Sequence, residues 1–325
     1  MKVFTDMYTF EIIRKLAEGG MGTVYEALQL GSNGFKKTVA LKMILPKFSS
    51  DKTFINMFIG EAMLVADLVH ENIVQVYQLS RIDDSFYIAM EFIHGISLEQ
   101  FLNKHKEKGV CIPIDIVTFI VSRVCRGLEY AHNKTDKEGN LLGVVHRDVT
   151  LKNIMIASEG FVKVADFGIA KVVNFKGQKE GDVLMGKAQY MSPEQAQCKE
   201  TDPRSDLFSV GIMLYELLTG ESPFKGETIK TTLNNVISSP IPVIEEQRKD
   251  VPEIVHKILY QCLDRDLEKR YQTAGQVGHD LEYYMYHDRY GPTNVTMGQY
   301  MKSMFPRLVI TSPVDMEKTV VSMKR

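Results

Sequence analysis

Two aspartates and one asparagine lie close together in the sequence and could hold a metal ion beside a reactive hydroxyl group. Asp148 is followed by Asn153, and Asp166 lies a short stretch further along. Because Mg²⁺ favours a few protein oxygens together with phosphate oxygens and water, Asn153 and Asp166 suit such an ion. Asp148 would then be left to orient a hydroxyl nucleophile and to accept its proton.

A glycine-rich stretch near the start of the chain could approach phosphate groups through its backbone. Residues 17–24 read AEGGMGTV and separate two strand-like segments. Glycine has no Cβ, so its amides can come close to phosphate oxygens. Alone, such a stretch is more often a simple hairpin turn. It is neither a P-loop nor a dinucleotide fingerprint, because no Gly-Lys-Ser/Thr follows and the next element is a strand.

Lys42 and Glu61 are candidates for an ion pair. Lys42 lies in the alternating segment TVALKMIL, on a face with Ala40 and Ile44. Glu61 falls on a helical stripe whose other members are apolar: Phe54, Phe58 and Val65. A carboxylate on an apolar face needs a cation, and Lys42 is the natural partner. Alternatively, Lys42 is a solvated edge residue and Glu61 lies in water at the margin of the stripe.

The elements that must position these residues change character along the chain. Strand patterns dominate the first ninety residues, interrupted by a helical segment over 51–69. The pattern changes near 91–95, and SLEQ from Ser97 predicts a capping box at a helix start. Long amphipathic helices are predicted over 114–132 and 206–220, and short strands over 153–157 and 161–166, joined by a turn at 158–160. After Gly291 the pattern weakens into a Met-rich tail.

Composition restricts the class of protein. The 325 residues are 44% hydrophobic and 25% charged, which is ordinary for a globular protein. A net charge of −2 gives no overall attraction to nucleic acid or anionic lipid. The four cysteines form no CxxC motif and are expected to be reduced, structural thiols of an intracellular protein. Neither a signal peptide nor a membrane span is apparent, so we expect a cytoplasmic protein.

Taken in order, these motifs resemble those of the eukaryotic-type protein kinase family. The chain shows AEGGMGTV from Ala17, VALK ending at Lys42, HRD ending at Asp148, DFG beginning at Asp166 and SPE ending at Glu194. Glu61, Asn153, Asp206 and Arg270 complete the series, which is highly specific when complete. The segments MGKAQYMSPEQ and YELLTGESPF are most similar to bacterial members of the Ser/Thr branch.

The resemblance implies an α+β, bilobal protein kinase fold over residues 8–290. It implies a small β-rich N-lobe over about 8–90, a hinge at 91–95 and a larger α-helical C-lobe over 96–290. Residues 291–325 would form a tail, which we expect to be a packing extension or linker. Its hydroxyl residues, Thr311, Ser312, Thr319 and Ser322, could alternatively belong to an autophosphorylated or pseudosubstrate segment.

It also implies residue roles, with ATP and Mg²⁺ as the cofactors and a protein as the substrate. Asp148 would accept the proton of the substrate hydroxyl, and Asn153 and Asp166 would bind Mg²⁺. Glu194 and Arg270 would pair, and Asp206 would hold the HRD backbone. The nucleotide site would comprise a set of residues from the strands, the hinge and the C-lobe: Leu16, Ala17, Gly19, Gly22, Val24, Ala40, Lys42, Glu61, Met90, Glu91, Ile93 and Met155.

The chain departs from the family pattern beside the catalytic aspartate. Thr150 stands where the family has a lysine that donates to the γ-phosphate, and Lys187 stands where it usually has threonine. We therefore expect Lys187 to replace the missing lysine. A second possible donor is Lys152, which resembles a basic residue that some tyrosine kinases place there. A third possibility is that Lys187 is only a solvated loop residue. Ala17, in place of the first loop glycine, should have a mild effect on ATP affinity.

A further departure concerns Arg147, which in the family usually receives a phosphate from the activation segment. Residues 169–185 contain no Ser, Thr or Tyr, so no such phosphate can form there. Glu180 or Asp182 could act as a fixed anion instead, unless these acids only keep the loop soluble. We predict activity without phosphorylation of this loop, and a required phosphate on Tyr190 or Ser192 would contradict that prediction.

Three functions fit these motifs to different degrees. A protein kinase acting on Ser/Thr hydroxyls fits best, because every residue for ATP, Mg²⁺ and proton transfer is present. Thr150 leaves open a nucleotide-binding pseudokinase or scaffold, and the changes at 150 and 187 leave open a dual-specificity kinase. A small-molecule kinase is disfavoured, because SPE, Asp206 and Arg270 belong to the peptide-binding segment. The sequence predicts no oligomeric state.

Overall fold

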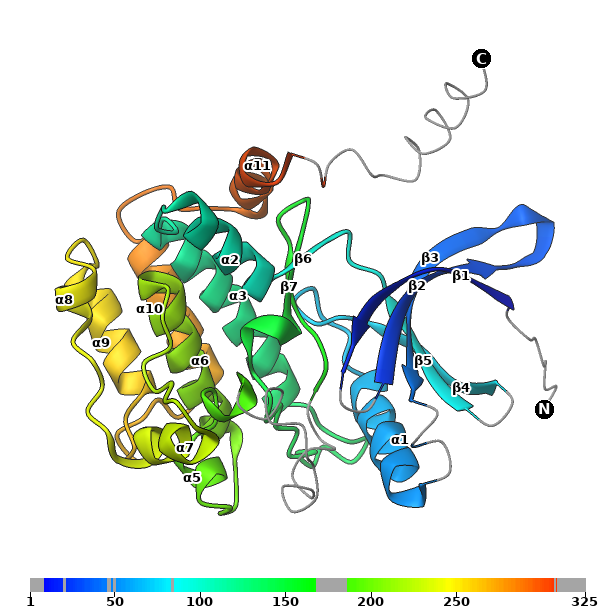
Figure 1. Ribbon diagram of the computed structural model, residues 1–325, viewed down its shortest axis with the longest axis horizontal. Helices are drawn as coiled ribbons and strands as arrows, with labels where there is room; N and C mark the ends of the chain where they lie inside the picture. Colours follow the sequence, from blue (N-terminus) through cyan, green and yellow to red (C-terminus); the bar gives the residue numbers. More distant parts are fainter. Residues whose placement is uncertain are drawn as a thin grey trace. The chain divides into compact units, whose positions relative to one another are not determined.

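The structure, a computed structural model, describes residues 9–19, 22–45, 48, 51–82, 85–167, 186–306 and 308, without the side chains of Met57 and Glu61. The chain divides into two compact units. The first consists of Met1–Val69 and Val74–Ile93, and the second of His70–Ile73 and His94–Arg325. The first is built around a sheet and the second is mainly helical (Figure 1).

The first unit is a five-stranded antiparallel sheet with one helix. The strand order is β1-β2-β3-β5-β4. The elements are β1 (Thr9–Glu18), β2 (Gly22–Leu30), β3 (Lys36–Ile44), α1 (Lys52–Ala66), β4 (Val76–Ile82) and β5 (Ser85–Glu91). The predicted alternation of β3 is confirmed. Leu41 packs with Val39 in a cluster on one face, whereas Ile44 packs with Phe58 of α1.

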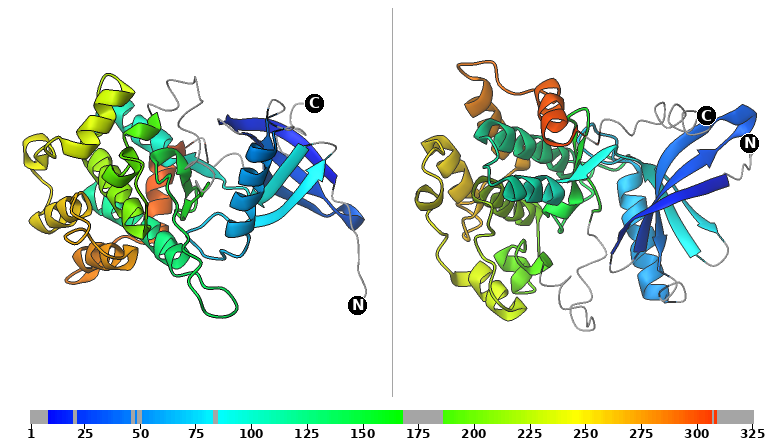
Figure 2. Two further views of the ribbon diagram at one scale, coloured as in Figure 1. Left: turned by 90° about the horizontal axis from the view of Figure 1, so that it is seen from below. Right: turned by 45° about the horizontal axis from the view of Figure 1, so that its top comes forward.

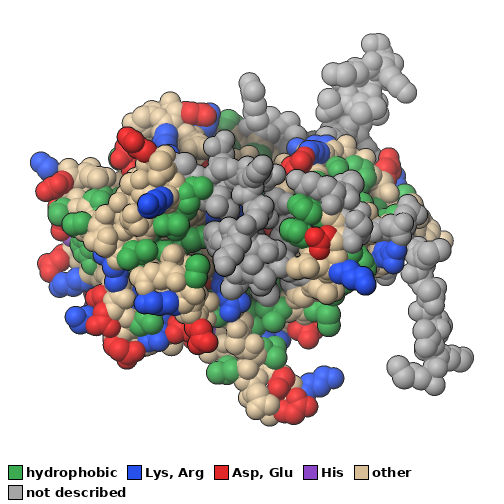
Figure 3. Space-filling model, turned by 60° about the horizontal axis from the view of Figure 1, so that its bottom comes forward, with side chains coloured by type: hydrophobic (Ala, Val, Ile, Leu, Met, Phe, Trp, Pro, Cys, Tyr) green, Lys and Arg blue, Asp and Glu red, His purple; other side chains and the backbone are tan. Residues whose placement is uncertain are grey.

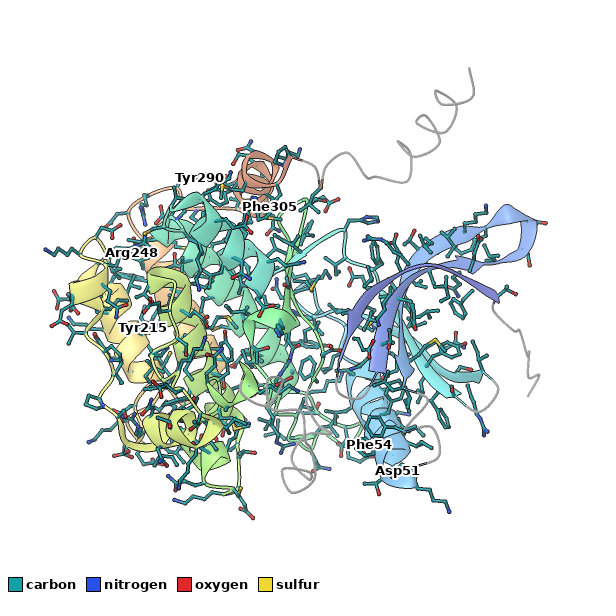
Figure 4. All side chains as sticks on the ribbon, in the orientation of Figure 1. Asp51, Phe54, Tyr215, Arg248, Tyr290 and Phe305 are labelled. Carbon is teal, nitrogen blue, oxygen red and sulfur yellow. The ribbon has the colours of Figure 1, made fainter. Side chains whose placement is uncertain are left out.

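The start of α1 is fixed by local contacts. Asp51 is the N-cap residue, and its carboxylate accepts hydrogen bonds from the amides of Thr53 (2.8 Å) and Phe54 (3.4 Å). The ring of Phe54 stacks on Phe48 at 4.1 Å, and Figure 4 shows Asp51 and Phe54 at this end of the helix. Capping satisfies amides that have no partner within the helix. The predicted helix over 51–69 is thus confirmed within a few residues.

The second unit contains a small sheet and a set of helices. Its strands are β6 (Gly95–Ser97), β7 (Ile154–Ala157) and β8 (Val162–Val164). The helices include α2 (Leu98–Lys108), α3 (Ile114–His132), α5 (Pro193–Ala196), α6 (Pro203–Thr219), α7 (Ile229–Ser238), α8 (Ile244–Gln247), α9 (Glu253–Cys262), α10 (Ala274–Tyr286) and α11 (Asn294–Met304). Nearly all of α6 is buried, and α3 packs against both α6 and α10 (Figure 2).

Several predicted boundaries are confirmed in this unit. The capping box at Ser97 is present, with its hydroxyl accepting from the Gln100 amide at 3.2 Å. Helix α3 has the predicted bounds, and the turn at 158–160 joins β7 to β8. Helix α6 begins earlier than predicted, at Pro203, because Asp202 caps it and proline is favourable in a first helical turn.

The C-terminal tail contains a helix that the sequence pattern did not indicate. Met297 and Met301 of α11 are buried, and the Tyr300 hydroxyl lies 2.7 Å from Nε2 of His105 in α2. A Cβ at Gly160, whose φ is +95°, would lie 2.1 Å from the Asn294 carbonyl oxygen. The first part of the tail thus packs on the second unit, whereas Thr311, Ser312, Thr319 and Ser322 lie outside the described residues.

All four cysteines are free thiols, as predicted. Cys125 and Cys262 are buried, and burial raises the pKa of both. Cys111 and Cys198 are exposed, so the prediction of structural thiols is wrong for these two. Among the described helices, none is long and apolar enough to cross a membrane. Figure 3 shows acidic and basic side chains interspersed over the face that it presents.

Candidate active site

The loop that carries Asp148 is anchored by a buried aspartate. Asp206, which is 1% exposed, accepts hydrogen bonds at 2.8 Å from the backbone amides of His146 and Arg147. His132 Nε2 lies 2.8 Å from the same carboxylate. Burial opposes the charge of Asp206, but the hydrogen bonds from His132 and the backbone hold its pKa below the usual range. The prediction that Asp206 holds the HRD backbone is confirmed.

Asp148 is held in place by Asn153. The Asn153 side-chain amide donates to the Asp148 carbonyl oxygen at 2.8 Å and to its carboxylate at 2.7 Å. The Asp148 amide in turn donates to Nδ1 of His146 at 3.2 Å. Asp148 is 8% exposed. Its carboxylate is therefore fixed in direction while it keeps access to solvent.

The donor set at Asn153 and Asp166 fits a hard cation. Since both protons of the Asn153 amide are directed to Asp148, its side-chain oxygen points away from that residue. The Ala165 amide donates to the Asn153 carbonyl oxygen at 2.8 Å, which brings Asp166 near Asn153. The backbone of Asp166 has a φ of +51°, a left-handed conformation. Amide and carboxylate oxygens are the ligands that Mg²⁺ prefers.

The two candidate lysine donors and Thr150 lie in different environments. Lys187 Nζ is 3.9 Å from Oδ2 of Asp148, and its side chain is 35% exposed. Lys152 Nζ is 3.7 Å from the Glu99 carboxylate, and its side chain is 69% exposed. Thr150 is buried. The structure thus brings Lys187 to Asp148 and directs Lys152 to another acidic group.

Arg147 contacts a residue that sequence reasoning missed. Its Nε donates to the Thr201 hydroxyl at 3.1 Å, and its carbonyl oxygen accepts from Gln195 Nε2 at 3.1 Å. Nothing in the spacing of 147 and 201 indicates this contact, because the two residues are joined only by the fold. The anions expected for Arg147, Glu180 and Asp182, lie outside the described residues.

The SPE segment is fixed by a buried ion pair, as predicted. Arg270 Nη1 lies 2.8 Å from Oε1 of Glu194, and the side chains are 0% and 8% exposed. The Ser205 hydroxyl also donates to Glu194 at 2.7 Å. Burial opposes ionisation of Glu194, but Arg270 and Ser205 hold its pKa below the usual value.

Ser192, the first residue of this segment, and Tyr190, which lies just before it, are both buried. The Tyr190 hydroxyl donates to Glu216, and the Ser192 hydroxyl accepts from the Gln195 amide to cap α5. Burial is the largest cause that raises the pKa of Tyr190, and the nearby Glu216 carboxylate raises it further. Both hydroxyls therefore have structural partners within the fold.

The first unit carries the glycine-rich turn and Lys42. The Gly19 amide donates to the Gly22 carbonyl oxygen at 2.8 Å. A Cβ at Gly22 would lie 2.6 Å from the Met43 carbonyl oxygen, so only glycine fits there. Lys42 is opposite Val24 of β2 and Ile88 of β5. The side chain of Glu61 lies outside the described residues, so the predicted pair with Lys42 remains a prediction.

The other predicted nucleotide-site residues belong to both units. Ala17 is opposite Val24, and Ala40 is opposite Met90. Leu16 is 38% exposed on β1. Glu91 is the last residue of β5, and its amide donates to the Gln75 carbonyl oxygen. Ile93 is the last residue of the first unit. Met155 lies on β7 of the second unit.

Comparison with known proteins identifies the family. The model of the protein kinase domain matches residues 10–281. The chain belongs to the protein kinase family. The kinase domain of Mycobacterium tuberculosis PknI has the same fold in its crystal structure, with a TM-score of 0.63 and 24% identity over 86% of this chain and 97% of that one. The predicted bilobal fold is confirmed, and the two units are its N-lobe and C-lobe.

Bacterial kinases are among the curated relatives. The chain is 36% identical over 296 residues to the tyrosine-protein kinase MasK of Myxococcus xanthus, covering 91% of this chain and 46% of that protein. It is 31% identical to the serine/threonine-protein kinase PrkC of Bacillus subtilis, covering 84% and 40%. The chain thus spans about half the length of such relatives or less. The resemblance to bacterial kinases is confirmed.

Proposed function

We propose that the chain is an ATP-dependent protein kinase that transfers the γ-phosphate of ATP to Ser/Thr hydroxyls of protein substrates. The observation that carries this proposal is the arrangement at Asp148, whose carboxylate is fixed by Asn153 and lies 3.9 Å from the Lys187 ammonium. A pseudokinase scaffold has no need for a base, a metal-binding amide and a cation in one place.

The reaction needs a base at the substrate hydroxyl. In the proposed step the hydroxyl oxygen attacks the γ-phosphorus and its proton passes to the Asp148 carboxylate. The bond from the γ-phosphorus to the bridging oxygen breaks, and ADP leaves. The side chains of Asn153 and Asp166 would hold Mg²⁺, which neutralises phosphate charge when bound. Lys42 would hold the α- and β-phosphates and pair with Glu61.

Binding of ATP is proposed from the same correspondence. Gly19 and Gly22 would cover the phosphates, and Ala40, Val24 and Met155 would enclose the adenine. Leu16, Ala17, Met90, Glu91 and Ile93 would complete the nucleotide site. Because ATP and reduced thiols belong to the cytoplasm, that is where we place the reaction.

Lys187 would supply the cation that the catalytic loop lacks. An ammonium beside Asp148 can stabilise the carboxylate before transfer and the γ-phosphate during it, because charge develops on the phosphate oxygens. Lys152 is disfavoured, since its ammonium lies 3.7 Å from the Glu99 carboxylate and its side chain is 69% exposed, against 35% for Lys187. Loss of a group that donates to the transferring phosphate should reduce kcat by about 10²-fold or more.

A second candidate is transfer to tyrosine. One relative, MasK, is named a tyrosine-protein kinase, and positions 150 and 187, which usually separate the two kinase classes, are both altered here. Ser/Thr transfer is favoured because other relatives, including PrkC, are named serine/threonine-protein kinases.

The function is tested by labelling a general basic protein with γ-labelled ATP and Mg²⁺, followed by phosphoamino-acid analysis. We expect phosphoserine and phosphothreonine with the wild-type chain and none with Asp148→Asn. Phosphotyrosine alone would support the second candidate. ATP binding without any transfer would make the chain a pseudokinase and overturn the proposal.

A further inference from the structure

We propose that Thr201 is a phosphorylation site and that its phosphate binds Arg147, in place of a phosphate on the activation segment. This inference rests on the proposed kinase function. It assigns a covalent modification to a residue of the loop that joins α5 to α6. Three features support it: the two side chains are in contact, Arg147 is positively charged, and Thr201 follows an exposed part of that loop.

The two side chains are already in contact. Nε of Arg147 donates to Oγ1 of Thr201 at 3.1 Å, and Oγ1 is the atom that would carry the phosphate. A phosphate there would replace a neutral acceptor with a dianion of three strong acceptor oxygens. Because guanidinium and phosphate form charge-assisted, often bidentate hydrogen bonds, the contact would become shorter and stronger.

Arg147 has donors for such a phosphate. A guanidinium carries five N–H groups, and the side-chain contact described above uses only Nε. Within the described part of the chain, Arg147 forms no ion pair with a carboxylate. This contrasts with Arg204 and Arg270 in the same lobe, each of which lies within 3 Å of an acidic oxygen.

Thr201 also lies where a phosphate would be stabilised by a helix. It directly precedes Asp202, the N-cap residue of the seventeen-residue helix α6. The Asp202 carboxylate already accepts from the Arg204 amide at 2.8 Å and is paired with the Arg204 guanidinium, so the phosphate would interact with the positive end of the helix dipole through its charge. The preceding residues 197–200 are exposed, so the loop is open to solvent on that side.

The usual acceptor positions cannot serve Arg147 in this chain. Residues 169–185 contain no Ser, Thr or Tyr. The Tyr190 and Ser192 hydroxyls are buried and engaged by Glu216 and the Gln195 amide. Thr201 is the hydroxyl that the structure places against the Arg147 guanidinium.

The modification uses the chemistry proposed for the active site. The Thr201 oxygen attacks the γ-phosphorus of ATP bound to a second copy of the chain, and its proton passes to that copy's Asp148. The bond between the γ-phosphorus and the bridging oxygen breaks, so that phosphothreonine and ADP are the products.

The phosphate would act on the catalytic loop through Arg147. The backbone of Arg147 is held by Asp206 on one side and by Gln195 of α5 on the other, and Asp148 follows it directly. Fixing the guanidinium at residue 201 would therefore hold the catalytic loop and α5 in one arrangement. We expect the phosphorylated enzyme to be about tenfold more active toward a protein substrate.

The test combines phosphosite mapping with activity. Wild type, Asp148→Asn, Thr201→Val and a control, Thr135→Val on an exposed hairpin, are incubated with Mg²⁺ and ATP and mapped by mass spectrometry. We expect phosphate on Thr201 in wild type and not in Asp148→Asn. Thr201→Val should lose about tenfold in activity, phosphatase treatment should lower wild type to the same level, and Thr135→Val should match wild type.

Failure of this inference can be separated from failure of the kinase proposal. If wild type labels a protein substrate while Thr201 carries no phosphate, or if Thr201→Val and phosphatase change nothing, the site is overturned and the kinase function stands. If wild type transfers no phosphate at all, phosphothreonine is installed at 201 by chemical or genetic means in the full chain. A rise in Tm of about 2–4 °C that Arg147→Gln abolishes would support the site, and no rise would overturn it.

Discussion

The buried frame of the active site and its open rim are built differently. The frame, defined here as Asp206 and the Glu194–Arg270 pair with their partners, uses contacts of about 2.8 Å between groups that are almost fully buried. The rim, defined as Lys187 and Arg147 with their partners Asp148 and Thr201, uses longer contacts of 3.9 Å and 3.1 Å. The chain keeps the family residues in the frame and departs from the family at Lys187. The proposed relocation of the cation to Lys187 would therefore change the rim and leave unchanged the frame that orients the loop.

The largest effect is expected from breaking the frame. Asp206→Ala removes the acceptor of two buried amides and of His132, so the free energy of unfolding should fall by about 3–5 kcal/mol, as when one partner of a buried pair is lost. Denaturant unfolding measures this change. Glu253→Ala, which removes the exposed partner of the exposed Lys257, is the control and should cost far less, because exposed ion pairs contribute little. Equal effects of the two changes would remove the distinction between frame and surface.

The stability that Glu194 contributes to the frame should also decrease as the pH falls. The pKa of Glu194 lies below its ordinary value of 4.5, so its charged form contributes stability above that value. This contribution is lost as pH falls through the lowered pKa. Between about pH 5 and pH 3 the wild type should therefore lose more unfolding free energy than Glu194→Gln. Parallel stability curves for the two proteins would show that Glu194 is not held charged by Arg270.

For Glu216, a buried carboxylate outside the frame, the free energy of unfolding should depend on pH in the opposite direction. Burial raises the pKa of Glu216, despite the hydrogen bond from Tyr190. Its charged form therefore costs stability above the ordinary pKa, and this cost is relieved as pH falls through the raised value. Compared with Glu216→Gln, the wild type should gain relative stability toward acid pH. Thermal unfolding at a series of pH values measures the difference, and a relative loss would contradict the assignment.

The smallest effect is expected at Lys152. Its ammonium is 3.7 Å from Glu99, and both groups are substantially exposed. Exposed pairs contribute little, so Lys152→Ala should change the unfolding free energy by less than about 1 kcal/mol. Its phosphotransfer rate should also match wild type. A loss of about 10²-fold in kcat would make Lys152 the missing donor and leave Lys187 without that role.

Local sequence signals predicted much of the fold. The bounds of α3 and the capping box of α2 follow from patterns within a few residues, and the motif series led correctly to the anchor at Asp206. Helix α11 was missed, because its buried Met297 and Met301 alternate with glycine and polar residues that weaken the helical pattern. Its stability comes from packing on α2, which no local pattern encodes.

The site was less completely predictable. The sequence left both Lys187 and Lys152 as possible donors. Only the tertiary fold, which brings the segment before SPE to the catalytic loop, shows that Lys187 lies near Asp148. Thr201 gave no signal at all, since its contact with Arg147 spans 54 positions. Contacts between distant segments depend on tertiary packing, and spacing alone does not specify them.

The proposed relocation of the cation is tested most directly by exchanging residues 150 and 187. Phosphotransfer to a basic protein is measured for wild type, Lys187→Thr and the double variant Lys187→Thr with Thr150→Lys, and folding of each is checked by thermal unfolding. We predict that Lys187→Thr loses about 10²-fold in kcat and that the double variant, which restores the family arrangement, recovers most of it. Full activity of Lys187→Thr would contradict the account, as would a folded double variant that stays inactive.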